Sequence, residues 1–218
     1  MALAHSYSAV KDFENCRRKY YEMRILKNYK SSDTDATLYG TAVHKAFEDF
    51  IQSGTPIPAK YAQFAKYVEP LLTIKGEIFC EEKMGIRADF TPCGFFDSDV
   101  WFRAIPDYLA VNRESGIARI VDYKTGKSSR YADTTQLELL AAMTMSYHPE
   151  IHTVRGALLF VVAGDVIRAE YTRGQLASIY SKWAGRANSI EQAVEHNNWG
   201  PSKSPLCNFC PVRSCEYN

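Results

Sequence analysis

Two aspartates and a lysine interrupt a pair of apolar segments in the middle of the chain. Asp107 directly follows Pro106. Asp122 and Lys124 lie two residues apart in "IVDYK". Two carboxylates that lie close together raise each other's pKa unless a cation sits between them, and a divalent ion with oxygen ligands is the natural cation. A neighbouring lysine can then hold a phosphate oxygen or an attacking water, so the spacing suggests metal-dependent hydrolysis, although an isolated Asp-x-Lys is more often a solvated surface pair.

Two antiparallel strands would bring these three side chains together. Side chains alternate across a strand, so Asp122 and Lys124 share one face. Pro106 cannot donate a hydrogen bond to a strand ladder and marks an edge or a bulge. One turn and one return strand would therefore place Asp107 beside Asp122. The expected strands are residues 100–111 and 117–124, joined by the turn "NRESG" at 112–116.

The rest of the pattern predicts helices on either side of these strands. Apolar residues recur at helical spacing in five segments, and a continuous apolar run is typical of a strand covered on both faces. The order of these segments favours an α/β fold with a mixed central β-sheet flanked by helices. The expected helices are 7–27, 36–51, 59–72, 133–148 and 174–196, and the further strands are 77–90, 154–164 and 166–172.

The composition limits the classes of protein that the chain can represent. It has 218 residues, of which 46% are hydrophobic, and a formal net charge of +1. We therefore expect one domain over residues 1–218, with phosphate binding supplied by local clusters or bound metal rather than by a global positive field. No signal-like N-terminus and no window near the ~18 apolar residues of a membrane span are visible, which predicts a cytoplasmic protein without a membrane partner.

Three of the six cysteines are closely spaced near the C-terminus. Cys207, Cys210 and Cys215 form C-x2-C-x4-C, a spacing suited to a metal or a cluster. A metal or cluster bound by these three thiolates would need a fourth ligand. Cys80 and Cys93 lie in or beside expected strands and are interpreted as small packed hydrophobes.

The central segment resembles the PD-(D/E)xK nuclease superfamily, which implies a restriction-endonuclease-like core. The motif is Pro106-Asp107, fourteen residues, then Asp122-Tyr123-Lys124. The RecB-like branch of that superfamily adds Gly-x-x-x-His upstream and a glutamine on the helix after the lysine, and both "GTAVH" at 40–44 and Gln136 match it. The resemblance covers roughly residues 6–215.

The resemblance implies a role for each matching residue. The implied metal ligands are His44, Asp107, Asp122 and the main-chain carbonyl of Tyr123, with Asp107, Asp122 and Lys124 as catalytic residues and Gln136 contacting the substrate strand. The carboxylates favour Mg²⁺ or Mn²⁺, and the imidazole shifts the preference toward Mn²⁺. A further glutamate often precedes the strands in this branch, and either Glu81 or Glu82 could fill that place, or both could simply form a solvated acidic strand face. Leu140 stands where the branch often has a tyrosine, and Arg17 where it often has a proline.

The cysteines extend the resemblance to iron-sulfur members of the branch, similar to the AddB-type, CRISPR-adaptation and phage exonucleases. Those proteins have one cysteine before the nuclease core and three after it, which implies that Cys16, Cys207, Cys210 and Cys215 bind a [4Fe-4S] cluster. The cluster would join segments 6–27 and 200–218. Zinc bound by the same four thiolates is the alternative, because spacing alone does not separate the two.

The implied function is a metal-dependent exonuclease acting on single-stranded DNA or linear duplex ends, 5′ to 3′, in recombination, repair or phage DNA metabolism. Arg17 and Arg18 could grip DNA, or could simply form the polar face of the first helix. No phosphate-binding GxxxxGK[ST] motif is present, so a helicase or recombination protein could be a partner. The location would be the host cytoplasm if the protein is phage-encoded, and the oligomeric state stays open. The alternative function is a DNA-binding or assembly subunit in which the cluster is structural.

Overall fold

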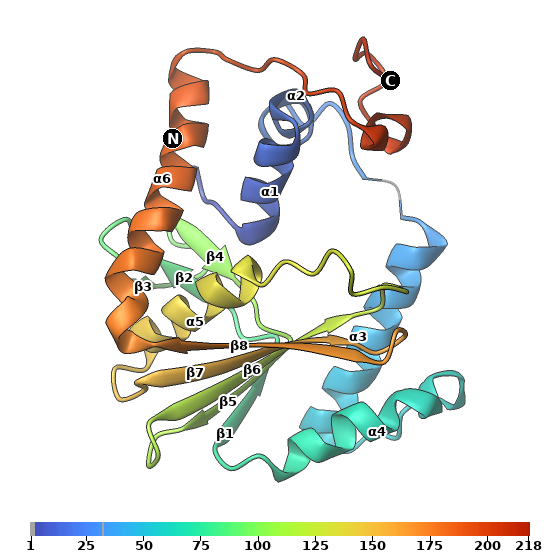
Figure 1. The fold of residues 1–218 in the computed structure, drawn as a ribbon, viewed down its shortest axis with the longest axis vertical. Coiled ribbons are helices and arrows are strands. Elements are labelled where there is room, and N and C mark those ends of the chain that lie inside the picture. The colour runs from blue at the N-terminus through green and yellow to red at the C-terminus, as the bar shows by residue number, and fades with distance from the viewer. Residues whose placement is uncertain (1–2, 32) are drawn as a thin grey trace.

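A mixed five-stranded sheet forms the centre of the computed structural model, which describes residues 3–31 and 33–218 (Figure 1). Its strand order is β1-β5-β6-β7-β8, and β6 and β7 are its parallel pair. The strands are β1 (Glu77–Cys80), β5 (Tyr108–Asn112), β6 (Ile117–Lys124), β7 (Thr153–Phe160) and β8 (Asp165–Thr172). A second sheet has the order β3-β2-β4 and consists of β2 (Met84–Ile86), β3 (Pro92–Cys93) and β4 (Phe102–Ala104).

Helices cover both faces of the central sheet (Figure 1). Parallel neighbours cannot be joined by a tight turn, so α5 (Thr135–Tyr147) crosses between β6 and β7. The same face carries α1 (Tyr7–Asn15) and α6 (Leu176–Glu195), and the opposite face carries α3 (Asp35–Ser53) and α4 (Ala65–Val68). The predicted α/β architecture with a mixed, helix-flanked sheet is confirmed. None of the helices in the described ranges is long and apolar enough to cross a membrane.

The alternation of side chains along each strand divides the apolar core into two clusters. Leu109 and Ile120 pack on the face covered by α1, α5 and α6. Tyr108 and Val121 pack on the face covered by α3 and α4. β6 is buried on both faces, and of the two charged residues at its end Asp122 is buried whereas Lys124 is partly exposed.

Two predicted strands are wrong, because each is divided between the two sheets. The predicted strand 77–90 breaks at Glu81, whose φ of +54° is left-handed and ends β1. The predicted strand 100–111 breaks at Pro106, between β4 and β5. A proline has no N–H for the ladder, so the chain leaves one sheet there and enters the other.

The predicted first helix, 7–27, is also divided. Cys16 has an extended backbone with φ −164° and ψ 112°, and its sulfur accepts a hydrogen bond from the Lys19 N–H. The chain therefore continues as α2 (Arg17–Tyr20) and a π-helical turn, η1 (Tyr21–Ile25). The predicted helix 59–72 is a series of short turns around α4. The 3₁₀ turns are η2 (Ala59–Phe64), η3 (Glu69–Thr73), η4 (Arg173–Gln175) and, in the tail, η5 (Pro205–Phe209).

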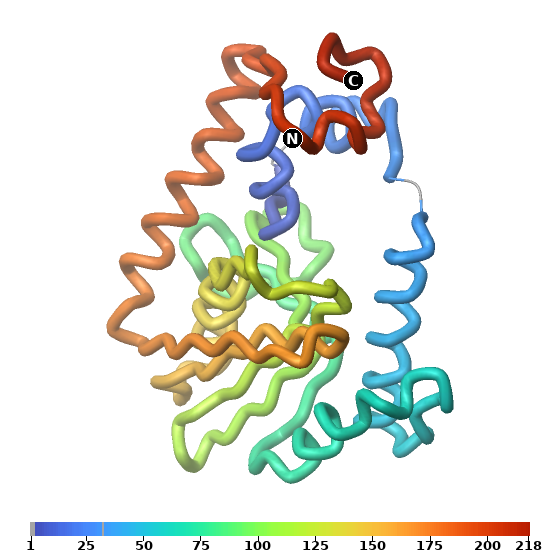
Figure 2. Tube along the Cα trace, turned by 45° about the vertical axis from the view of Figure 1, so that its right-hand side comes forward, coloured from blue at the N-terminus to red at the C-terminus, as the bar shows by residue number. Residues whose placement is uncertain are grey.

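The two ends of the chain meet on one side of the molecule. The C-terminal tail after α6 returns to lie beside α2, as both ribbon and trace views show (Figure 2). The Ser202 N–H donates to the sulfur of Cys16 at 3.5 Å. Segments almost 190 positions apart in the sequence are thus neighbours.

Candidate metal centre and cysteine cavity

The two aspartates meet where β5 begins and β6 ends. Tyr108 pairs with Val121, so the residue before β5 lies opposite the end of β6. The Tyr123 N–H donates to Asp107 Oδ2 at 2.6 Å. The Lys124 ammonium lies 2.6 Å from Asp122 Oδ2, and the Asp122 side chain is 5% exposed. The structure thus brings Asp107, Asp122 and Lys124 together.

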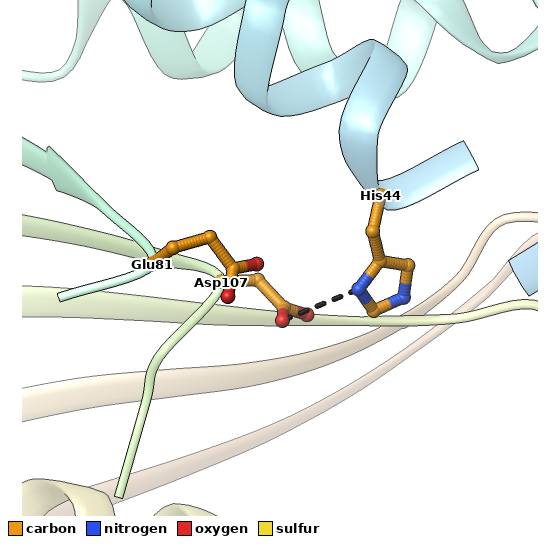
Figure 3. Close-up of side chains that lie close together, drawn as sticks. All are labelled: His44, Glu81 and Asp107. Carbon is orange, nitrogen blue, oxygen red and sulfur yellow. Dashed lines mark ion pairs between the residues drawn. The ribbon is translucent and has the colours of Figure 1, made fainter. Parts of the chain in front are cut away.

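His44 reaches the same place from α3, on the other side of the sheet. Its Nδ1 lies 3.3 Å from Asp107 Oδ1 (Figure 3). Gly40, one turn earlier, faces the loop after β6, where an added Cβ would lie 3.1 Å from Thr125 Oγ1. A larger residue would push the helix away from the strand end, so the glycine permits the close approach that delivers His44.

Glu81 is the glutamate that joins this group. One ligand atom from each of His44, Glu81 and Asp107 lies within 4.8 Å of the others (Figure 3). Cys80 pairs with Tyr108 across β1 and β5, which sets the next residue, Glu81, opposite Asp107. Glu82, the other candidate in the sequence, has its electrostatic influence on Tyr147 and His148 instead.

Gln136 completes the contacts in the first turn of α5. Its side-chain oxygen accepts from the Lys124 ammonium at 2.9 Å, and its amide nitrogen donates to Asp122 Oδ1. Gln136 therefore orients both groups. Leu140, one turn later, is 2% exposed and packs in the core, so the residue at the tyrosine position of the resembling branch supplies no hydroxyl.

The electrostatics of the site fit a bound cation. Burial and the charge of Asp107 raise the pKa of Asp122 to about 6, although Lys124 opposes the shift. Burial and Asp107 likewise raise the pKa of Glu81. Burial alone would lower the pKa of His44, but its hydrogen bond to Asp107 and the nearby negative charges raise it. Three carboxylates gather here and Lys124 pairs with Asp122, so a divalent ion with oxygen and imidazole ligands would relieve their repulsion.

The four cysteines predicted to act together line one cavity of about 200 Å³ between α2 and the C-terminal tail. They are Cys16, Cys207, Cys210 and Cys215. Backbone N–H groups of Lys19 and Ser202 each donate to the Cys16 sulfur at 3.5 Å, and the Ser204 N–H donates to the Cys207 sulfur at 3.4 Å. Such donors stabilise negative charge on sulfur. Cys80 instead packs against the core, and burial raises the pKa of its thiol to about 11.

The distances between the sulfurs of these four cysteines bear on whether zinc could bind in the cavity. Over residues 3–31 and 33–218, no three of these thiols have their sulfurs within 4.8 Å of one another. Tetrahedral zinc with Zn–S bonds of about 2.3 Å would draw its thiolates to about 3.8 Å apart. The cavity as it stands is wider than a closed zinc site.

Arg17 and Arg18 lie beside this cavity rather than at the carboxylates. The Arg18 guanidinium pairs with Glu22 at 2.6 Å and lines the cavity. The exposed Arg17 guanidinium lies 5.3 Å from the centre of the Phe13 ring. Arg18 is therefore largely neutralised within its own segment, whereas Arg17 keeps an exposed positive charge.

The chain resembles known proteins in family and in fold. Residues 4–215 match the profile of the PD-(D/E)XK nuclease superfamily. A solved structure from Eubacterium rectale, provisionally named an exonuclease, aligns with a TM-score of 0.54 at 16% identity, over 95% of this chain and 87% of that one. The structure of SSO0001 aligns with a TM-score of 0.51 at 12% identity, over 98% and 86%. At these identities the likeness concerns the fold, and no curated protein matches the sequence.

Proposed function

Because the chain belongs to the PD-(D/E)XK nuclease superfamily, we propose that it is a metal-dependent DNA exonuclease of the RecB-like branch. Its substrates would be single-stranded DNA or linear duplex ends, degraded 5′ to 3′, in recombination, repair or phage DNA metabolism. The observation that carries the proposal is the meeting of Asp107, Asp122 and Lys124 at one strand end, with His44 delivered from the opposite layer.

The residues that would hold Mg²⁺ or Mn²⁺ are His44, Glu81, Asp107, Asp122 and the main-chain carbonyl of Tyr123. In a strand the N–H and C=O of one residue point to the same side, and the Tyr123 N–H points at Asp107. Its carbonyl therefore faces the carboxylates as well. When bound, the ion supplies acidity to water and offsets negative charge on the phosphate.

The protein's own groups orient the reaction. Lys124 is fixed between Asp122 and the Gln136 oxygen, and it keeps 35% exposure of its side chain. Its ammonium can donate to a phosphate oxygen or hold the attacking water, which is stabilisation by a donor already in place. Gln136 holds this lysine and faces the substrate strand. Asp107 orients His44 through their ion-pair contact.

We also propose that Cys16, Cys207, Cys210 and Cys215 bind a [4Fe-4S] cluster. The shared cavity, the N–H donors to sulfur and the wide spacing of the thiols support it. A cluster there would tie the returning tail to α2. Zinc is the alternative and would require the thiols to close in.

The basic residues and the lack of a motor motif suggest how DNA reaches the site. Arg17, whose guanidinium is exposed, and Arg18, if it leaves its pair with Glu22, would contact phosphates of a strand passing from the cluster to the carboxylates. A helicase or recombination protein would supply strand separation. A cytoplasmic location, in the host if the gene is carried by a phage, is part of the same proposal.

Digestion of end-labelled DNA tests the exonuclease proposal. With Mn²⁺ or Mg²⁺, linear single strands and duplex ends should be degraded to nucleotides, whereas closed circular DNA should survive at least tenfold longer, because a strand must enter by its end. The rates are compared on gels at equal DNA mass. Circles cut as fast as linear DNA would refute the exonuclease mode, and DNA binding without any cutting would favour the assembly-subunit alternative.

The affinity for Mn²⁺ should fall as the pH is lowered through about 6. The pKa of Asp122 is raised to about 6, so protons compete with the metal below that pH, and the raised pKa of His44 adds a second competing proton. Affinity should level off only at a pH where both groups have lost their protons, and below that it should fall about tenfold per pH unit for each proton taken up. Calorimetric titration between pH 5 and 8 measures it, and a pH-independent affinity would show that these groups do not bind the metal.

A further inference from the structure

A cavity of about 430 Å³ adjoins the carboxylate site on the side of α5. Its walls come from the N-terminal segment at residues 3–9, from η1, and from the end of β4 with the loop before it. The residues that line it include His5, Arg24, Phe95, Arg103, Gln136 and Leu140. None of the site residues predicted from the sequence points to this cavity except Gln136.

Gln136 connects the cavity to the proposed active site. Its side chain lines the cavity and also bonds Lys124 and Asp122. A molecule in the cavity would therefore contact the same amide that holds the lysine.

Backbone hydrogen bonds hold the wall of the cavity in place. His5 is 1% exposed and forms an isolated bridge with Phe102 of β4. The His5 N–H donates to the Trp101 carbonyl at 2.7 Å, and the Arg103 N–H donates to the His5 carbonyl at 2.8 Å. These bonds fix the N-terminal segment against β4, so the backbone that carries Arg103 is held in place.

Arg103 offers the cavity a positive charge. Within the described ranges, its guanidinium has no carboxylate within ion-pair distance, whereas Arg24 on the opposite wall is paired with Asp12 at 2.6 Å. The guanidinium lies 5.4 Å from the Phe95 ring centre and 5.8 Å from that of Phe96. A guanidinium without a carboxylate partner is suited to a phosphate, and its planar face to a base.

Phe96 is an exposed aromatic next to Phe95, the phenylalanine that lines the cavity. Phe96 is 75% exposed, and the Lys83 ammonium lies 5.5 Å from its ring centre. Phe95 and Phe96 are in edge-to-face contact, with ring centres 5.0 Å apart. Aromatic rings next to cations are the usual platform on which unpaired bases stack.

We propose that this cavity binds the unpaired nucleotide that flanks the scissile phosphate, with Arg103 on its phosphate or base and Phe95 and Phe96 beside the base. The inference rests on the proposed nuclease function. The volume lies within the ~300–1,000 Å³ typical of small-molecule sites, which suits one nucleotide, whereas a base pair is wider. The apolar wall at Leu139 and Leu140 would accept the ring of a base. The pocket therefore selects a frayed or single-stranded end at the site.

Binding of single-stranded oligonucleotides to the metal-chelated protein tests the pocket. In fluorescence anisotropy, Arg103→Ala should weaken binding about tenfold, which corresponds to ~1.4 kcal/mol. Arg103→Lys keeps the charge but loses the planar group and should fall in between. Arg113→Ala is the control for the loss of one positive charge. Arg113 pairs with Glu77 and Glu150 at the turn remote from the carboxylates. The Arg113→Ala protein should therefore bind the oligonucleotide like the wild type.

A scan with single abasic nucleotides locates the contact. One abasic position next to the cleavage point should weaken wild-type binding by a similar factor and should have no further effect in Phe95→Ala or Arg103→Ala. Circular dichroism checks that each variant is folded. Equal binding by wild type and folded Arg103→Ala, or additive losses from the abasic site and the substitution, would overturn the pocket.

DNA cleavage in Mn²⁺ is measured in parallel, because it separates the proposed nucleotide pocket from the proposed nuclease function. If the wild type cuts DNA while Arg103→Ala binds and cuts normally, the pocket fails and the nuclease proposal stands. If Arg103→Ala loses binding while the wild type cuts no DNA, the nucleotide pocket stands and the nuclease proposal fails.

Discussion

Replacing Lys124 by alanine should lower the rate of metal-dependent DNA cleavage by roughly 100–1,000-fold, the usual cost of losing one donor that stabilises developing charge. The ammonium is held in place by Asp122 and by the Gln136 side-chain oxygen. Binding of Mn²⁺ should persist, because lysine is not a ligand. The rate is measured on an end-labelled single strand at saturating Mn²⁺.

In the same variant, Lys124→Ala, we also expect a change in the pKa of Asp122. Lys124 lowers the pKa of Asp122, so its removal should raise that pKa above about 6. The pH at which Mn²⁺ affinity begins to fall should therefore move upward. Lys75→Ala is the matched control, since Lys75 is an exposed lysine before β1, near the end of the strands remote from Asp107. Full activity in folded Lys124→Ala would contradict its assigned role.

Replacing Cys16 by serine should remove the iron-sulfur cluster and destabilise the protein by roughly 5 kcal/mol, if the loop-closure relation for disulfides carries over to a cluster. The cluster would close a loop from Cys16 to Cys207, nearly the whole chain. For a chain of this size the midpoint of thermal unfolding should fall by roughly 10–20 °C. Thermal unfolding, visible absorbance, and iron and sulfide content are measured on anaerobically purified protein.

Cys93→Ser provides the control for that experiment. Cys93 lies in β3, outside the cysteine cavity, so its replacement should leave iron content and the unfolding midpoint unchanged. A colourless wild type carrying one equivalent of zinc would refute the cluster and support the zinc alternative. Unchanged stability of Cys16→Ser in iron-loaded protein would refute the proposed tie between the chain ends.

The sequence predicted those parts of the site that depend on local rules. Alternation along one strand placed Asp122 beside Lys124, and a single turn brought Asp107 opposite them. Each of these relations depends on residues that are close together in the sequence and on the alternation of side chains along one strand. The family resemblance singled out Gln136 as a contact of the substrate strand, and its hydrogen bonds to Lys124 and Asp122 were not predicted.

The parts that sequence reasoning missed depend on pairing between distant segments. Glu81 is selected over Glu82 because β1 pairs with β5 in one register and then breaks at a left-handed residue. The break at Pro106 sends the chain into a second sheet, which a continuous strand pattern does not reveal. Arg103 faces a cavity because His5 pairs with Phe102, nearly 100 positions away. The missing N–H of Pro106 was the one local signal that the strand ended there.

The decisive measurement for a metal-dependent nuclease is the release of nucleotides from an end-labelled single strand by protein freed of metal. We expect no release in excess chelator, rapid release once Mn²⁺ is supplied, and a loss of roughly 100-fold or more in Asp122→Asn. Cleavage that continues in the chelator, or that Asp122→Asn retains in full, would contradict it.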